Sequence, residues 1–245
     1  MATTDTQLTE TLVDDRMQAT VTPLADRSWL VLAIAVLPVP LTSAVFIGLA
    51  AVGGQQEAYG LPIAYLVYGA ANLVTVGTLY ALLSTDERSA VFRFGVPSVR
   101  EVGWAVVAFV VGLGVFQVTS LASAALGYEL QGLSYSLGSP TTVAMVVVGA
   151  VVLAPLTEEI LYRGLVLGVL LSRGVGVVAA VALMTGLFAI IHLPNFGVAG
   201  TLFISVWGLL PALVRLRFDN LSGAVLMHAL NNTFAYLVVV GMGWA

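Results

Sequence analysis

The run from Thr141 to Leu171 constrains the fold of this chain more than any other stretch. It is strongly apolar, yet it carries three charged side chains close together, Glu158, Glu159 and Arg163. A charge at the centre of a bilayer costs about 2.5–3.5 kcal/mol on insertion scales, so charged groups there are usually paired or functional. The run therefore predicts a long apolar helix that carries a polar site.

The composition extends this pattern to the whole chain. Of its 245 residues, 59% are hydrophobic and 9% are charged, and the mean hydropathy is +1.01. Soluble domains carry about 25% charged residues, and apolar runs of about 20 residues cross a bilayer as helices. We therefore predict an all-α, polytopic transmembrane helix bundle of about seven spans. The predicted spans cover residues 29–52, 61–83, 102–126, 141–171, 175–193, 198–216 and 221–244.

The chain is predicted to have three parts. Residues 1–28 are polar and acidic, which is typical of a disordered or surface-lying cytoplasmic tail. Residues 29–139 hold three transmembrane helices and a linker, and residues 140–245 hold a core of four helices. The absence of cysteine excludes disulfides and thiolate metal sites. A net charge of −4, without a basic patch, argues against a nucleic-acid partner.

The distribution of arginines predicts the orientation in the membrane. All nine basic residues are arginines, and all except Arg163 fall on the same side of a seven-span topology. Because loops rich in Lys and Arg face the cytoplasm, we expect a multi-pass protein of the cell membrane. Its N-terminus would be cytoplasmic and its C-terminus extracytoplasmic. The arginines on the predicted cytoplasmic side are Arg16, Arg27, Arg88, Arg93, Arg100, Arg173, Arg215 and Arg217.

Helical spacing divides the three charges of the long run into a pair and a single group. Glu159 and Arg163 are four residues apart and share a helix face, so they are predicted to form a supporting ion pair. Glu158 is rotated by roughly 100° from Glu159 and has no cationic partner in its own helix. Tyr162, one turn after Glu158, is expected to hydrogen-bond it. A carboxylate left alone in this way needs a partner from another helix.

The only two histidines of the chain lie in other apolar runs. His228 and Asn232 are four residues apart and share a helix face. At 1.5 Å per residue from the arginine-bearing turns, Glu158 lies about 22 Å deep and His192 about 26 Å deep. His228 and Asn232 lie about 16 and 22 Å deep by the same rise. These groups occupy one slab of the bundle and are predicted to converge.

Three motifs follow one another along the chain: Glu158-Glu159-x-x-x-Arg163, Phe188-x-x-x-His192 and His228-x-x-x-Asn232. In this order they resemble the motifs of the CPBP intramembrane proteases, which include the type II CAAX prenyl endopeptidases and the bacteriocin-immunity (Abi) proteins. The resemblance covers roughly residues 140 to 235 and makes this part the catalytic core. It implies peptide-bond hydrolysis inside the membrane, by a family described both as metalloproteases and as glutamate-dependent.

Residue roles follow from the resemblance and from the chemistry of each group. Glu158 would take a proton from water and return it to the leaving amine, and His192 would hold the same water. His228 and Asn232 would donate hydrogen bonds to the oxyanion of the tetrahedral intermediate. The expected activity is endopeptidase cleavage of membrane-associated proteins, with prenylated CAAX-type proteins as one substrate class.

A metal is considered separately because Glu158, His192 and His228 form a two-histidine, one-carboxylate set that can bind zinc. However, neither histidine belongs to an H-E-x-x-H helix. If Glu158 bound the metal, another base would be needed beside the ligands. We therefore expect no resident metal, with zinc on these three residues as the alternative.

Other interpretations stay open from the sequence. Glu158 could be a neutral, hydrogen-bonded acid, His192 an interfacial side chain, and His228 with Asn232 a polar contact between helices. A proton-coupled transporter would also use Glu and His, although no inverted repeat is visible. A non-catalytic immunity or scaffold protein is the third class. Peptide cleavage by the wild type and by Glu158→Gln distinguishes the peptidase, the transporter and the scaffold protein. Glutamine keeps the shape of the side chain but cannot act as a base.

Overall fold

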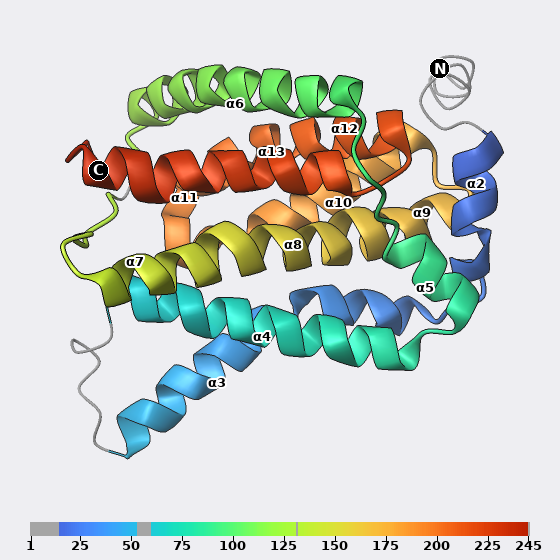
Figure 1. Ribbon diagram of the computed structural model, residues 1–245, viewed down its shortest axis with the longest axis horizontal. Helices are drawn as coiled ribbons and strands as arrows, with labels where there is room; N and C mark the ends of the chain where they lie inside the picture. Colours follow the sequence, from blue (N-terminus) through green and yellow to red (C-terminus); the bar gives the residue numbers. More distant parts are fainter. Residues whose placement is uncertain (1–14, 53–59, 131, 245) are drawn as a thin grey trace.

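The computed structural model describes residues 15–52, 60–130 and 132–244. Within these ranges the regular structure is entirely helical, and long helices lie side by side in a bundle (Figure 1). Residues 53–59, between the first two predicted spans, and the first half of the predicted tail lie outside them. The all-α prediction is confirmed for the described chain.

Four helical segments among the described residues are long and apolar enough to cross a membrane. They are Leu61–Leu82, Val99–Ala125, Pro140–Ser172 and Leu193–Phe218. A fifth is counted if two short helices bent by 96°, Met17–Leu24 and Trp29–Val36, form one broken span. The structure thus supports a membrane-spanning bundle, whereas the predicted number of about seven spans is not confirmed.

Three of the predicted spans take a different form in the structure. The first predicted span divides at Pro38 into η2 (Trp29–Val36) and α3 (Pro38–Ala51), as expected where proline removes a backbone donor. The predicted span 175–193 becomes α10 (Val177–Ile190), and the last becomes α13 (Ser222–Thr233) followed by η6 (Phe234–Val239).

The segment Pro140–Ser172 runs through the bundle and changes its turn type along the way. Two π-helical stretches alternate with α-helical ones, and the second begins at Glu159. π-helical turns are rare and frequently occur at functional sites. The successive elements are α7 (Pro140–Val146), η4 (Val147–Leu153), α8 (Ala154–Glu158), η5 (Glu159–Val166) and α9 (Leu167–Ser172).

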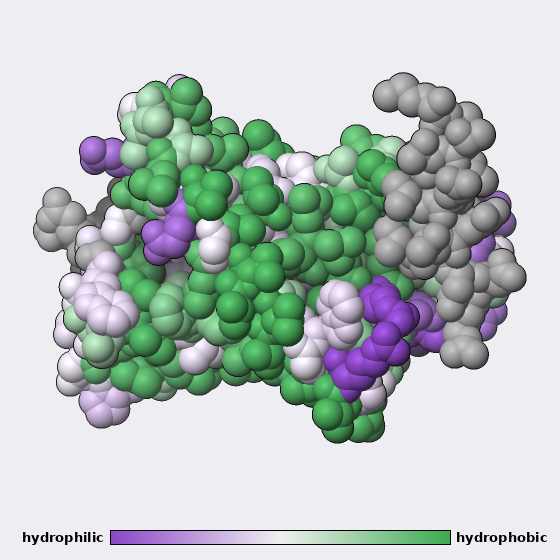
Figure 2. All heavy atoms as spheres, turned by 90° about the horizontal axis from the view of Figure 1, so that it is seen from above, coloured by the Kyte–Doolittle hydropathy of each residue, from purple (hydrophilic) through white to green (hydrophobic). Residues whose placement is uncertain are grey.

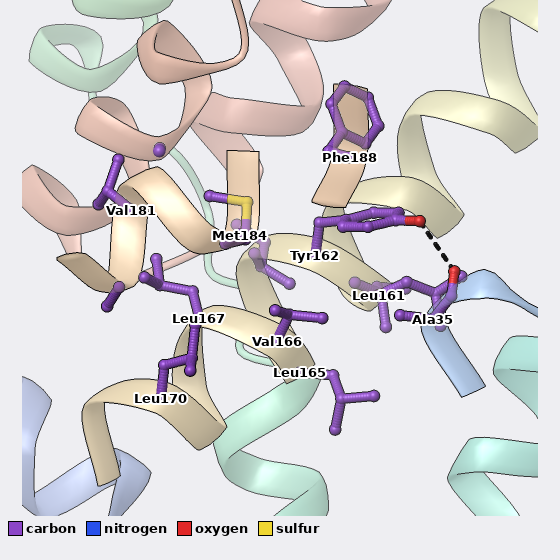
Figure 3. Packing of buried hydrophobic residues seen from close by; sticks show 14 of the residues in the cluster. Ala35, Leu161, Tyr162, Leu165, Val166, Leu167, Leu170, Val181, Met184 and Phe188 are labelled. Carbon is purple, nitrogen blue, oxygen red and sulfur yellow. Dashed lines mark hydrogen bonds between the residues drawn. The ribbon is translucent and has the colours of Figure 1, made fainter. Parts of the chain in front are cut away.

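The surface and the interior both fit a bilayer. Figure 2 shows apolar side chains across the middle of the visible face, with hydrophilic residues toward its ends. Inside, Leu161 and Leu165 belong to the hydrophobic core around α9 and α10 (Figure 3). Tyr162 is also buried there, and its hydroxyl donates to the carbonyl oxygen of Ala35 at 2.9 Å. The expected bond from Tyr162 to Glu158 is therefore not formed.

The N-terminal segment differs from the predicted tail where the structure describes it. Residues 15–24 form α2 (Asp15–Val21) and η1 (Thr22–Leu24), and the side chains of Met17, Val21 and Leu24 are fully buried. These apolar residues recur at helical spacing, so they form one face that packs onto the bundle. The polar composition of the tail concealed this face.

Arginine contacts gather at one end of the bundle. Arg27 forms an ion pair with Glu87 of α5 (Thr85–Val91), and this hydrogen bond lowers the pKa of the Glu87 carboxyl to about 2. Arg93 pairs with Asp219, which follows α12 (Leu209–Phe218). Figure 1 shows α2, α5 and the end of α9 at this same end. The predicted grouping of the loop arginines on one side agrees with these contacts.

A glycine lets a neighbouring helix pack closely against the central segment Pro140–Ser172. A Cβ on Gly149 of η4 would lie 2.5 Å from the backbone carbonyl of Tyr65 in α4 (Leu61–Leu82). Gly186 of α10 is different, because no described atom outside its own turn lies within 4 Å of the corresponding position. The close approach of α4 to the central segment therefore depends on Gly149.

We expect Gly149→Ala to destabilise the protein by about 1–3 kcal/mol, since the added methyl group forces α4 and η4 apart. Gly186→Ala is the matched control, and it should be neutral or stabilising because alanine favours a helix interior. Thermal unfolding of the purified variants in detergent measures both changes. Equal unfolding temperatures for the two variants would contradict the proposed contact.

Candidate active site

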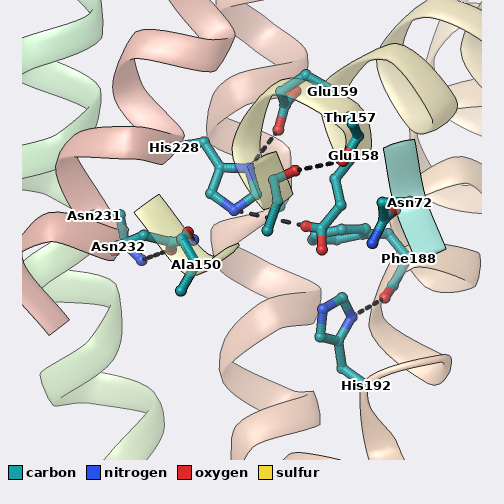
Figure 4. A network of polar contacts seen from close by, with 12 residues as sticks. Asn72, Ala150, Thr157, Glu158, Glu159, Phe188, His192, His228, Asn231 and Asn232 are labelled. Atoms are coloured by element: carbon teal, nitrogen blue, oxygen red, sulfur yellow. Dashed lines mark hydrogen bonds and ion pairs between the residues drawn. The ribbon is translucent and has the colours of Figure 1, made fainter. Parts of the chain in front are cut away.

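The site is built around His228, whose imidazole lies between two glutamates (Figure 4). Its Nδ1 is 2.8 Å from Oε1 of Glu159, and its Nε2 is 3.7 Å from Oε2 of Glu158. The two glutamates end α8 and begin η5, whereas His228 comes from α13. All three side chains are buried. Two helices far apart in the sequence thus place both acids on one imidazole.

Glu159 forms the ion pair predicted from its spacing and a second contact that was not predicted. Its Oε1 accepts from Nη1 of Arg163 at 3.0 Å as well as from Nδ1 of His228. The guanidinium of Arg163 also donates through Nη2 to the carbonyl oxygen of Gly208 at 2.8 Å and lies over the ring of Phe188. Glu159 therefore connects its own helix to α13 and, through Arg163, to α12.

The hydrogen bonds of the histidines define which ring nitrogens remain free. His192 follows α10, and its Nδ1 lies 2.7 Å from the carbonyl oxygen of Phe188. A carbonyl can only accept, so Nδ1 of His192 carries the proton and Nε2 keeps a lone pair in the neutral ring. The Glu159 carboxylate also only accepts, so Nδ1 of neutral His228 carries the proton as well. Each Nε2 is then available to the site.

His192 and His228 are joined by aromatic rings. The centroid of Phe188 lies 4.7 Å from that of His192 and 6.3 Å from that of His228. Trp207, at the end of α11 (Leu193–Trp207), meets the His228 ring edge-on at 4.9 Å. In Figure 4 the His192 imidazole lies on the side of the Glu158 carboxylate that is away from Glu159. Phe188 therefore packs between the two histidines.

Asn232 lies one turn beyond His228 and has a backbone partner. Its Nδ2 donates to the carbonyl oxygen of Ala150 in η4 at 2.8 Å, and its Oδ1 accepts a longer bond from Asn231 at 3.4 Å. One of its two amide hydrogens therefore remains for a ligand. The structure brings Glu158 and His228 together, as predicted. Asn232 lies one turn farther along α13, where its amide is bonded to Ala150.

The residues that would hold a zinc ion are not gathered as a metal site. Among the described residues, no group of three or more His, Cys, Asp or Glu side chains is close enough to hold a metal ion. Glu158, His192 and His228 have suitable donor atoms for zinc, and both histidines keep Nε2 for it while Nδ1 of His228 contacts Glu159. The chemistry below uses the side chains of the protein alone.

One site residue was missed because it lies outside the three motifs. Asn72 of α4 is fully buried, and Figure 4 shows it beside the site on the other side of Glu158 from His228. An asparagine in the otherwise apolar span of residues 61–83 was the available sequence signal, since polar groups in membranes are rare and mark functional positions.

We expect Glu159→Gln to lower the stability in detergent by about 3–5 kcal/mol, because breaking a buried pair strands the remaining charge. Arg163→Gln should cost a similar amount, and the double variant should cost less than the sum. Glu158→Gln is the matched neighbouring substitution and should cost little, since Glu158 lies outside that ion pair. Strict additivity of the first two changes in thermal unfolding, or strong coupling of Arg163 to Glu158, would reverse this assignment.

Comparison with known proteins supports the resemblance drawn from the motifs. Residues 140–234 match the model of the family described as type II CAAX prenyl endopeptidase Rce1-like. The matched segment runs from α7 to the first residue of η6, so it includes both glutamates, both histidines and Asn232. No curated protein and no solved structure gives a significant match to the chain.

Proposed function

We propose that the chain, whose residues 140–234 match the type II CAAX prenyl endopeptidase model, is an intramembrane endopeptidase. Its substrates would be membrane-associated proteins, and the family match suggests prenylated CAAX-type proteins among them. The observation that carries the proposal is the buried Glu158 carboxylate, 3.7 Å from His228 and beside His192 (Figure 4) within apolar helices. The match favours a peptidase over the transporter and the scaffold protein considered above.

In this mechanism Glu158 activates a water molecule. The carboxylate accepts one proton of the water, and the lone pair on Nε2 of His192 accepts a hydrogen bond from the other. The water oxygen then bonds to the scissile carbonyl carbon. When the C–N bond breaks, Glu158 returns its proton to the leaving amine, so that one water is consumed and the enzyme is restored.

The developing oxyanion needs donors, and the structure offers two. Asn232 has one amide hydrogen beyond the bond to Ala150. The second donor is Nε2 of His228 when the ring carries both protons, and the hydrogen bond from Nδ1 to Glu159 holds that ring in place. Donors held in place before the reaction stabilise such charge without reorganisation. Glu159 and Arg163 orient His228 and take no part in bond making.

Glu158→Gln and His192→Ala are each expected to lower peptide turnover by at least about 10², the contribution of a general base. The purified protein would be reconstituted with a library of prenylated and plain peptides, and cleavage would be followed by mass spectrometry. Glu101→Gln is the matched control, because Glu101 is buried among contacts to Asn220 and Gly223 at the arginine end of the bundle.

Each outcome of this experiment decides between functions. Wild-type cleavage by Glu158→Gln would show that Glu158 is not the base. Proton flux without peptide cleavage by the wild-type protein would indicate a transporter. We also propose that no resident metal takes part, so treatment with a chelator should leave the rate unchanged.

The orientation proposed for the enzyme places its arginine end in the cytoplasm, following the positive-inside rule. A reporter fused after Ala245 is then expected on the extracytoplasmic side, and one inserted near Glu87 on the cytoplasmic side. Protease protection in intact cells measures both positions. A cytoplasmic C-terminus would contradict the proposed topology and would require an even number of spans.

A further inference from the structure

The turn between α10 and α11 carries His192 and a second aromatic side chain, Phe196. Phe196 lies four residues after His192, so the two side chains share one face of the first turn of α11. The backbone N–H of Phe196 donates to the carbonyl oxygen of His192 at 2.9 Å. The centroids of the two rings lie 5.8 Å apart, and the interplanar angle is 31°. This spacing falls within the range of favourable aromatic pairs.

Two glycines hold Phe196 in this place. Gly197 has φ 62° and ψ −169°, a backbone conformation that essentially only glycine adopts. It kinks α11 and separates the first turn, which carries Phe196, from the rest of the helix. Gly200 leaves room for the aromatic side chain, because a Cβ at this position would lie 2.5 Å from Cβ of Phe196. The backbone of α11 therefore fixes the Phe196 ring beside the imidazole.

The imidazole of His192 is held at one edge and against two rings. Its Nδ1 lies 2.7 Å from the carbonyl oxygen of Phe188 (Figure 4), and a single hydrogen bond lets a ring turn about it. The Phe188 ring meets the imidazole at 63°, whereas the Phe196 ring is tilted by only 31°. Two aromatic contacts at different angles limit that rotation, so Nε2 of His192 keeps a fixed direction.

Phe196 differs from the other rings of the site in the histidine that it contacts. Phe188 contacts both His192 and His228, and Trp207 contacts His228. Among the described residues, Phe196 is the ring that contacts His192 without contacting His228. A change at Phe196 therefore acts on the histidine that holds the water and leaves the one that binds the oxyanion in place.

We propose, on the basis of the peptidase function above, that Phe196 is a positioning residue for His192. Its ring packs on the imidazole and keeps the lone pair of Nε2 directed at the water that Glu158 deprotonates. The kink at Gly197 and the space at Gly200 are the backbone features that allow this contact. Phe196 acts through His192, and the proton transfers remain those of Glu158.

Phe92 offers a matched control for a substitution at Phe196. Both phenylalanines are partly buried and pack against the hydrophobic core. Phe92 directly follows α5, at the arginine end of the bundle, and its ring pairs with that of Tyr80 at 5.2 Å. Phe92→Leu thus removes an aromatic pair as Phe196→Leu does, but outside the site.

The first test measures the kinetics of the full-length protein reconstituted with a cleavable peptide. We expect Phe196→Leu to lower kcat about threefold to tenfold, the effect of losing one aromatic pair, with KM changed less than about twofold. Phe196→Tyr should keep most of the rate because it retains the ring, and Phe92→Leu should keep the wild-type kcat. An unchanged kcat in Phe196→Leu, or an equal loss in Phe92→Leu, would overturn the proposal.

The second test needs no substrate, because the chain has only two histidines. In protein labelled at histidine and purified without a histidine tag, NMR in detergent records one set of signals for each imidazole. The set missing from His192→Gln belongs to His192. We expect Phe196→Leu and Gly200→Ala to shift this set, because one removes the neighbouring ring and the other displaces it. The His228 signals should keep their position, and Phe92→Leu should shift neither set.

The two measurements separate this contact from the proposed function. Unmoved His192 signals in Phe196→Leu would overturn the contact and the positioning role with it. Shifted His192 signals in a protein that cleaves no peptide would support the contact and overturn the peptidase function instead.

Discussion

The structure depends on one buried carboxylate, that of Glu159. It accepts from Arg163 in its own helix and from His228 in α13, while Arg163 also holds the carbonyl of Gly208. These are the contacts that make a full charge tolerable inside an apolar bundle, because a buried ion without its partner is strongly destabilising. They also set the relative position of three helices. The apolar surface of the bundle alone would not select this register, since helices slide easily over one another where only aliphatic groups meet.

The chemistry proposed for the neighbouring glutamate follows from this arrangement. Glu158 is the next residue to Glu159 along the chain, so it points to a different side of the helix and meets the other nitrogen of His228. The ion pair is thus complete without Glu158, which lies between His228 and Asn72 of α4, with His192 on a further side (Figure 4). A single imidazole between two carboxylates gives them separate roles, in which Glu159 fixes the ring and Glu158 remains free to exchange a proton with water.

Parts of this account were visible in the sequence because they depend on spacing within one helix. The four-residue interval predicted the pair of Glu159 and Arg163, and the apolar runs predicted an all-helical membrane protein. Contacts between helices were less accessible: the bond from His228 to Glu159 depends on the relative height of α13 and η5, which the π-helical turns alter. Burial of Met17 was hidden by the polar residues around it, and Asn72 precedes the motifs, all of which lie after residue 140. The number of about seven spans is not confirmed, because the structure divides some of the apolar runs into shorter helices.

The central claim is that Glu158 activates water and does not itself attack the peptide bond. Cleavage under single-turnover conditions in water enriched with ¹⁸O tests it directly, with mass spectrometry of the peptide products and of the enzyme fragment that contains Glu158. The account predicts one ¹⁸O atom in the new carboxyl terminus of the product and none in the enzyme fragment. Incorporation of ¹⁸O into Glu158, as expected for a covalent acyl intermediate on that carboxylate, would contradict it.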